Sequence, residues 1–249
     1  ADKQVVLLTG ASRGLGLAVL KLLLKGTDKT PAANVVTLSR SEPKELQQLQ
    51  QDFPDALAVV KGNVTELSDN KRAVDEALQR WKRLDALILN AGIAEFARIE
   101  NLVRASLTQS PEALLNTLNV NTVSLVTTIR AALPSLRERH GRVVFVSSGA
   151  AVGNYASWAP YKYVARLTQR LEAALNSIAR TLANEEPDIA SFSVRPGVVD
   201  TDMQTQIRGS NTMNQAEHSK FLDLHKEGKL LPADKPASVL AALALRGSR

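Results

Sequence analysis

Short apolar runs alternate along the chain with segments whose apolar positions recur every three or four residues. The runs have the length and β-branched composition of buried strands, and the segments between them have helical periodicity. Strands are expected at 5–8, 35–38, 57–60, 84–89, 143–146 and 189–194, and helices at 15–24, 43–51, 67–81, 111–136, 161–183 and 236–245. Apolar strands bracketed by amphipathic helices indicate a doubly wound α/β fold, with one parallel sheet covered on both faces.

The chain has no internal repeat, low-complexity linker or break in composition, so we expect a single domain over residues 1–249. In such a fold, ligands bind at the carboxyl ends of the strands. Residues 201–229 are polar and helix-prone, with one Gly-Ser-Asn break, and are predicted to form a mobile lid over that edge. This stretch is called the lid segment below.

The composition excludes several kinds of site and partner. Cysteine is absent, which excludes disulfides, thiolate catalysis and cysteine metal sites, and the three histidines show no metal-ligand spacing. No run of about 18 apolar residues and no signal-peptide pattern is present, so a cytoplasmic location without a membrane partner is expected. The net charge is +6, but the basic residues are interleaved with acidic and apolar ones, which argues against a nucleic-acid partner.

A glycine-rich turn follows the first expected strand and opens the first expected helix. It reads Thr-Gly-Ala-Ser-Arg-Gly-Leu-Gly over residues 9–16. Glycines at this place let the backbone approach a pyrophosphate, whose charge then meets the N-terminus of a helix. A turn of this kind alone also fits an ordinary tight connection, but its position directly after a strand favours dinucleotide binding.

The turn resembles the fingerprint of the short-chain dehydrogenase/reductase family. Further motifs follow in the order of that family: Asn-Ala-Gly at 90–92, Asn-Val-Asn at 119–121, Ser148 with Tyr161, and Pro-Gly-Val-Val-Asp-Thr at 196–201. Stretches such as Val-Phe-Val-Ser-Ser-Gly-Ala are similar to fungal benzil-reductase-like members, which are akin to sepiapterin reductases. The resemblance implies a Rossmann-type oxidoreductase acting on a small-molecule carbonyl. The seventh strand and homodimer usual in that family remain open, because no strand pattern follows the last expected helix.

Charge suggests which cofactor the chain binds. An NAD site places an acidic residue after the second strand, whereas this chain has Arg40 there and Arg13 inside the glycine turn. Two guanidinium groups suit a 2′-phosphate, so the sequence predicts NADP(H). Asn63 stands where the family often has aspartate, and it serves equally well to cap its own loop. The resemblance places the cofactor-binding residues at Gly10, Ser12, Arg13, Gly14, Leu15, Gly16, Arg40, Asn63, Val64, Asn90, Ala91, Gly92, Pro196, Gly197, Val199 and Thr201.

The resemblance also implies the residues that carry out catalysis. Ser148 would hydrogen-bond the carbonyl oxygen, Tyr161 would protonate it, and Asn121 would anchor a water of the proton relay. A free tyrosine has a pKa of about 10, so Tyr161 needs a cationic neighbour to act near neutral pH. The family has a lysine four residues further on, where this chain has Ala165, and aligning the next motif places Glu172 there instead.

Three interpretations of residues 162–172 stay open. Lys162 or Arg166 supplies the missing cation, although both lie about 100° or more around the helix from the expected direction. Alternatively, the protein is an NADP(H)-binding sensor or interaction protein with little or no turnover. The segment could also be a natural insertion, an engineered change or an error in the gene prediction.

We favour an active reductase of a hydrophobic or aromatic ketone, diketone or aldehyde. The aromatic and sulfur side chains expected near its pocket, or simply packed under a loop, are Phe96, Tyr155, Trp158 and Met203.

Overall fold

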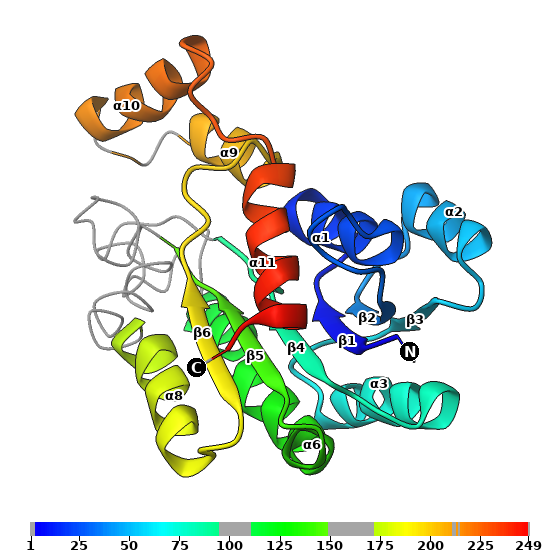
Figure 1. The fold of residues 1–249 in the computed structure, drawn as a ribbon. Coiled ribbons are helices and arrows are strands. Elements are labelled where there is room, and N and C mark those ends of the chain that lie inside the picture. Colours follow the sequence, from blue (N-terminus) through cyan, green and yellow to red (C-terminus); the bar gives the residue numbers. More distant parts are fainter. Residues whose placement is uncertain (1–2, 95–110, 149–171, 211–212, 214, 249) are drawn as a thin grey trace.

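The computed structural model describes residues 3–94, 111–148, 172–210, 213 and 215–248 (Figure 1). All six expected apolar runs form strands, and they join one parallel sheet in the order β3-β2-β1-β4-β5-β6. Within the described residues this is a six-stranded doubly wound sheet of the Rossmann type. The strands are β1 (Val5–Thr9), β2 (Asn34–Ser39), β3 (Leu57–Lys61), β4 (Ala86–Leu89), β5 (Arg142–Val146) and β6 (Ala190–Val194).

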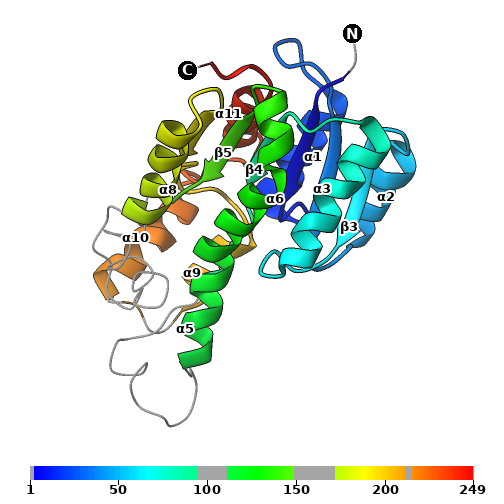
Figure 2. The ribbon, with the colours of Figure 1, turned by 90° about the horizontal axis from the view of Figure 1, so that it is seen from below.

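Helices cover both faces of the sheet. Helices α3, α6 and α8 lie on one face, and α1, α2 and α11 lie on the other (Figures 1 and 2). The helices are α1 (Gly14–Lys25), α2 (Lys44–Asp52), α3 (Leu67–Trp81), α5 (Pro111–Leu118), α6 (Ser124–Glu138), α8 (Glu172–Glu185), α9 (Asp202–Arg208), α10 (Gln215–Lys226) and α11 (Asp234–Arg246). In the helices that cover the sheet, the hydrophobic periodicity that predicted them marks the face that each turns to the sheet.

The strands are apolar along nearly their whole length because the sheet has a core on each side. Side chains that alternate along β1 separate between the two cores: Val5 and Leu7 join the cluster with α3 and α6, whereas Val6 and Leu8 join the cluster with α1 and α11. All four are fully buried. The sheet is therefore a rigid platform, and β1 and β4, where the strand order reverses, lie at its centre.

β4 begins at Ala86, two residues later than the expected strand at 84–89. The side chain of Asp85 explains the difference, because its buried carboxylate accepts a hydrogen bond from the backbone N–H of Val5 at 2.7 Å. Arg83 donates to both oxygens of the same carboxylate, at 2.8 and 2.7 Å. A bidentate, charge-assisted pair therefore fixes the amino end of the central strands.

The long helix expected at 111–136 is not uniform. A π-helical turn, η1 (Asn119–Val123), separates α5 from α6, so the prediction of one regular helix was wrong at its centre. The backbone N–H of Ser124 reaches back to the carbonyl of Asn119, and the hydroxyl of Ser124 donates to the carbonyl of Val120 at 2.6 Å. Hydrophobic spacing alone does not reveal a single-turn insertion of this kind, which often occurs at functional sites.

The lid segment contains two helices, α9 and α10, on either side of the expected break. Its own apolar cluster is formed by Ile207, Met213 and Phe221. The two ends of the segment meet at Leu231, whose N–H donates to the carbonyl of Val198 and whose carbonyl accepts from Asp200, both at 2.9 Å. The lid segment thus leaves and rejoins the rest of the fold at one place, where these hydrogen bonds join its two ends, and it lies beyond the carboxyl ends of the strands (Figure 1).

Candidate functional site

The glycine turn between β1 and α1 is held in a shape that only glycine fits. Gly10 has a φ of +72°, and a Cβ on it would lie 2.8 Å from the Cα of Ala91. A Cβ on Gly16 would lie 2.1 Å from the carbonyl oxygen of Gly10, closer than any real contact. The turn therefore leaves a surface of bare backbone at the carboxyl end of β1, which fits the close approach of a pyrophosphate.

The N-terminus of α1 opens onto this surface. Its first backbone hydrogen bond runs from Leu17 N–H to the carbonyl of Arg13 at 3.2 Å. No side chain caps the helix, and no acidic residue lies in its first turn. The N–H groups of Gly14, Leu15 and Gly16 precede Leu17, the first donor of the intrahelical hydrogen bonds, and so have no acceptor within the helix, which is the arrangement that binds anions.

The end of β4 is fastened to the glycine turn. The side-chain amide of Asn90 donates to the carbonyls of Thr9 at 3.1 Å and Gly10 at 3.0 Å. The hydroxyl of Thr9 in turn accepts from the backbone N–H groups of Asn90 and Ala91, both at 3.1 Å. The structure therefore brings the Asn-Ala-Gly motif beside the glycine turn, as expected. Thr9, the first residue of the glycine-turn motif, contributes to this site although it was not among the expected cofactor-binding residues.

The end of β2 lies on the other side of the turn. The backbone N–H of Gly10 donates to the carbonyl of Leu38, and that of Ala11 donates to the hydroxyl of Ser39 at 3.1 Å. Arg40 follows immediately and is exposed. Because Ser39 ties the end of β2 to the turn that carries Arg13, both guanidinium groups belong to the same edge of the sheet.

Arg13 has a partner in the lid segment. Its Nη1 lies 3.4 Å from Oδ2 of Asp202, the first residue of α9, and the side chains are 67% and 68% exposed. Asp202 was not among the expected site residues, and no local sequence signal connects two positions 189 residues apart.

Asn63 and Val64 follow β3. The side-chain oxygen of Asn63 accepts from the N–H of Thr65 at 3.2 Å, and its own backbone N–H donates to Asp69 at 2.7 Å. The loop-capping interpretation of Asn63 therefore holds, while contact with an adenine ring stays a prediction. The side chain of Val64 is buried in the core beside α3, so any contact of this residue with a ligand would come from its backbone.

Asn121 lies in the π-helical turn and fixes the segment after β4. Its Oδ1 accepts from the backbone N–H of Ile93, and its Nδ2 donates to the carbonyl of the same residue, both at 2.9 Å. A Cβ on Gly92 would lie 3.5 Å from Oδ1 of Asn121. An amide has two donor hydrogens and two acceptor lone pairs, so each polar atom retains capacity for a water.

Ser148 lies two residues beyond the end of β5, next to the other strand ends. The preceding residue, Ser147, is anchored by a backbone hydrogen bond to the carbonyl of Val194 at 2.8 Å. Ser148 is partly buried. Tyr161, Lys162, Ala165 and Arg166 lie outside the described residues. The side chain of Glu172 at the start of α8 does too, so the proton donor and its electrostatic partner stay predictions.

The Pro-Gly turn after β6 is packed against the base of the lid segment. Gly197 has a φ of +83°, and a Cβ there would lie 2.7 Å from the side chain of Leu231. Val199 is buried and pairs with Leu231 in an isolated parallel bridge. A Cβ on Gly14 would lie 3.3 Å from the methyl group of Thr201. The turn at 196–201 therefore reaches the glycine turn, as the predicted site requires.

Of the substrate-side candidates, Met203 is the one that lies within the described residues. It packs against the lid cluster of Ile207, Met213 and Phe221, which supports the packing interpretation. Phe96, Tyr155 and Trp158 lie outside the described residues.

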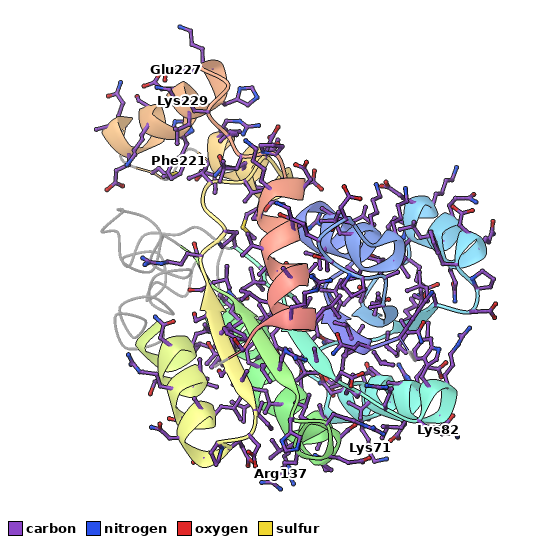
Figure 3. The ribbon with its side chains drawn as sticks, viewed as in Figure 1. Lys71, Lys82, Arg137, Phe221, Glu227 and Lys229 are labelled. Atoms are coloured by element: carbon purple, nitrogen blue, oxygen red, sulfur yellow. The ribbon has the colours of Figure 1, made fainter. Side chains whose placement is uncertain are left out.

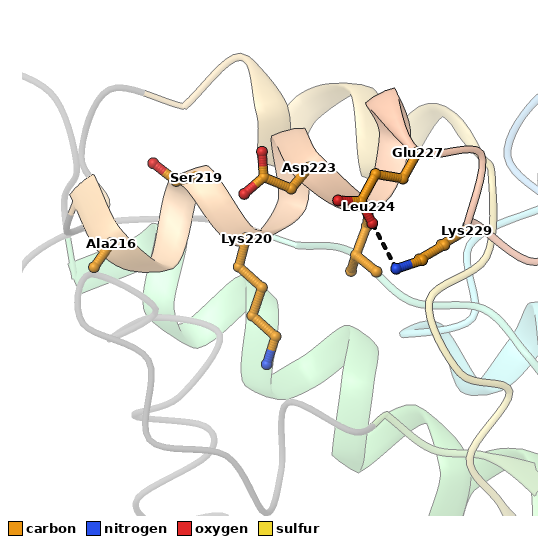
Figure 4. A pocket seen from close by; sticks show the side chains of 7 residues that line it. All are labelled: Ala216, Ser219, Lys220, Asp223, Leu224, Glu227 and Lys229. Carbon is orange, nitrogen blue, oxygen red and sulfur yellow. Dashed lines mark ion pairs between the residues drawn. The ribbon is translucent and has the colours of Figure 1, made fainter.

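Two open clefts lie away from the predicted site. One, of about 320 Å³, runs along α10 and is lined by Ala216, Ser219, Lys220, Asp223, Leu224, Glu227 and Lys229 (Figure 4). There the carboxylate of Glu227, 2.6 Å from Lys229, raises the pKa of that lysine. The other, of about 310 Å³, lies between α6 and α8. Neither cleft is lined by a residue expected to bind the cofactor.

Basic side chains are distributed over separate helices. Figure 3 shows Lys71 and Lys82 beside α3, and Arg137 at α6. Arg137 donates to Glu186, and this contact raises the pKa of the guanidinium and lowers that of the carboxylate. Among the described residues, no group of three or more metal-ligating side chains comes together, and no helix is long and apolar enough to cross a membrane.

Comparison with known proteins identifies the family of the chain. The sequence profile described as short chain dehydrogenase matches residues 4–212, and therefore spans the glycine turn, Ser148 and the Pro-Gly turn. An uncharacterized oxidoreductase of Schizosaccharomyces pombe is 37% identical over 249 residues, covering 99% of this chain and 92% of the relative. A benzil reductase of Saccharomyces cerevisiae that forms (S)-benzoin is 33% identical over 252 residues, covering 98% and 91%.

Solved structures agree as well. A short chain dehydrogenase/reductase from Saccharomyces cerevisiae superimposes with a TM-score of 0.87 at 34% identity, covering 99% of this chain and 92% of that one. The match extends over the sheet, both helical layers and the strand ends that hold the glycine turn. The chain belongs to the short-chain dehydrogenase/reductase family of oxidoreductases.

Proposed function

We propose that the protein is an NADP(H)-dependent carbonyl reductase. The observation that carries the proposal is the glycine turn, where Gly10 and Gly16 leave no room for a side chain and α1 begins without a cap. Two exposed guanidinium groups, Arg13 and Arg40, flank this backbone surface. Bare backbone suits a pyrophosphate and the two cations suit a 2′-phosphate, so the residues present fit NADP(H).

Each part of the chain then has a task in holding the cofactor. The turn at 10–16 takes the pyrophosphate, Asn90 to Gly92 border the adenosine ribose, and the segment from Pro196 to Thr201 takes the nicotinamide carboxamide. The bound cofactor would supply a hydride to a carbonyl carbon. The fixed hydrogen bonds of Thr9 and Asn90 and the bridge between Val199 and Leu231 support these assignments, because they hold the backbone in place before binding.

The proton chemistry is assigned to Ser148 beyond the end of β5, Asn121 of the π-helical turn, and Tyr161. As charge builds on the carbonyl oxygen, Ser148 donates a hydrogen bond to it and Tyr161 transfers a proton. Asn121 fixes Ile93 and uses its remaining amide capacity to hold the water that resupplies the tyrosine. The π-helical turn supports this assignment of Asn121, because it sets the amide toward the segment after β4.

The substrate is proposed to be an aromatic or hydrophobic ketone or diketone. The support is the identity of 33% to a benzil reductase over nearly the whole of both chains. Benzil is a diketone flanked by aromatic rings, and such a substrate needs an apolar cavity rather than charged anchors. Reduction of one of its carbonyls consumes one hydride and one proton, the two species that the proposed site delivers.

Charge removal at the two arginines tests the choice of cofactor. Changing Arg13 and Arg40 together to glutamine is expected to weaken NADPH binding by about tenfold to a hundredfold, because charge-assisted hydrogen bonds to the phosphate are lost. NADH, which lacks that phosphate, should bind as before. Calorimetric titration of both cofactors measures the change, and Arg130→Gln, an exposed arginine on α6, is the control. Tighter binding of NADH than NADPH to the unmodified protein would contradict the assignment.

The alternative function is that of an NADP(H)-binding sensor or interaction protein with little turnover. It is favoured by the alanine at position 165, where the family places the lysine that assists the tyrosine. Both functions share the same cofactor site, so cofactor binding does not separate them. Turnover of a carbonyl substrate does.

We also propose that two copies of the chain associate through the outer face of α5, η1 and α6. Leu115, Val123 and Val126 are 55%, 48% and 49% exposed there, at helical spacing, and the cleft between α6 and α8 adjoins them. Exposed apolar patches of this kind mark association surfaces.

Val126→Asp is expected to raise the dimer dissociation constant by about tenfold or more, because a buried charge would lack a partner. Light scattering after size exclusion measures the mass. Leu222→Asp on α10 is the control, and a monomeric unmodified protein would refute the proposal.

A further inference from the structure

The contact between Arg13 and Asp202 joins the cofactor side of the molecule to the lid segment. Arg13 lies at the start of α1 and Asp202 begins α9, and the nearest nitrogen and oxygen are 3.4 Å apart. Neighbouring residues hold the two segments together, since the space beside Gly14 is occupied by the methyl group of Thr201. The start of α9 is therefore held beside the glycine turn by a contact that does not depend on the charge of Asp202.

The same guanidinium is the one assigned to the 2′-phosphate. A phosphate monoester carries a charge of about −1.5 to −2 near neutral pH, whereas a carboxylate carries a single negative charge. Both anions compete for Arg13, and the carboxylate that remains nearby repels the incoming phosphate. Both effects act in the same direction, because each lowers the affinity for the phosphorylated dinucleotide and leaves that for the unphosphorylated one unchanged.

We propose that Asp202 is a specificity-determining residue that weakens NADP(H) binding relative to NAD(H) by competing with the 2′-phosphate for Arg13. The inference rests on the proposed role of Arg13. As a consequence, the preference for NADP(H) over NAD(H) is smaller than Arg13 and Arg40 alone would give, because a residue of the lid segment opposes it.

The expected effect is small, and its size follows from the exposure of the pair. Arg13 and Asp202 are about two-thirds exposed, and ion pairs in such positions contribute little because water screens them. Asp202→Asn is therefore expected to tighten NADPH binding by about twofold to fivefold. The effect should shrink as the salt concentration rises, because the charges face solvent.

Calorimetric titration of the full chain with NADPH and with NADH tests the proposal. The variants are Asp202→Asn, Arg13→Gln and the two combined. The control is Asp234→Asn, an exposed aspartate that likewise begins a helix, α11. Tighter NADPH binding in Asp202→Asn, unchanged NADH binding, no change in Asp234→Asn and no further gain in the Arg13→Gln background would support it.

An NADPH dissociation constant equal to that of the unmodified protein would overturn the inference, as would equal tightening for NADH. The proposed function is judged separately, from the ratio of the two dissociation constants in the unmodified protein. If that protein prefers NADH, the assignment of NADP(H) fails, while the comparison of Asp202→Asn with the unmodified protein still decides the role of Asp202.

Discussion

Replacing Gly16 with alanine is expected to weaken dinucleotide binding severely. The added Cβ would lie 2.1 Å from the carbonyl oxygen of Gly10 and 2.5 Å from Nδ2 of Asn90. The first contact is with backbone, which no rotamer change can relieve, so the glycine turn must move away from α1. Overpacking of this kind costs about 1–3 kcal/mol of unfolding free energy. The displaced turn should weaken NADPH binding by about a hundredfold or more, because the N–H groups at the start of α1 lose their alignment.

Two measurements separate loss of binding from loss of folding. Calorimetry gives the NADPH dissociation constant, and urea unfolding followed by circular dichroism gives the stability. Gly209→Ala is the matched control, since a Cβ there has only an ordinary contact of 3.4 Å with the carbonyl of Thr205. A folded Gly16→Ala variant that binds NADPH like the unmodified protein would show that the turn is not the pyrophosphate site.

Changing Tyr161 to phenylalanine is expected to lower carbonyl turnover by about a hundredfold to ten-thousandfold, the usual contribution of a general acid. The hydroxyl is the only group removed, so the NADPH dissociation constant should stay the same. Steady-state kinetics with an aromatic diketone and calorimetry with NADPH measure the two quantities. A Tyr161→Phe variant with the turnover of the unmodified protein would remove this residue from the mechanism.

Ala165→Lys, the companion variant, tests residues 162–172. If the segment lacks a cation near Tyr161, a lysine four residues further on should raise turnover and move the alkaline arm of the pH–rate profile to lower pH, because it lowers the pKa of the proton donor. If Lys162 or Arg166 already supplies that charge, the added lysine should leave both quantities unchanged. The first result favours an enzyme impaired by the missing lysine. The second favours an enzyme in which Lys162 or Arg166 takes the place of the family's lysine.

Much of the fold could be predicted because its signals are local. The runs around Val6, Val36 and Ile88 are almost entirely apolar, which a strand with a core on each face requires. The glycine turn could be predicted for a different reason. Gly10 and Gly16 are irreplaceable, and their spacing marks the turn without any knowledge of the residues that surround them.

Other features depend on contacts between distant residues and leave no local signal. The π-helical turn at Asn121 is stabilised by Ile93, which lies on another segment. β4 begins later than expected because Asp85 binds Val5, whose position is known only once β1 and β4 are paired. The pair of Arg13 and Asp202 likewise requires the whole fold, since the packing of the lid base brings α9 to the glycine turn.

Carbonyl-dependent consumption of NADPH tests the assigned function most directly. The purified protein is mixed with NADPH and an aromatic diketone, the fall in NADPH absorbance is followed, and the product is identified by chromatography. We expect NADPH to be consumed in equal amount to the hydroxyketone formed, faster than NADH, and hardly at all by Tyr161→Phe. Tight NADPH binding without consumption across ketones, diketones and aldehydes would contradict the reductase and leave a cofactor-binding protein.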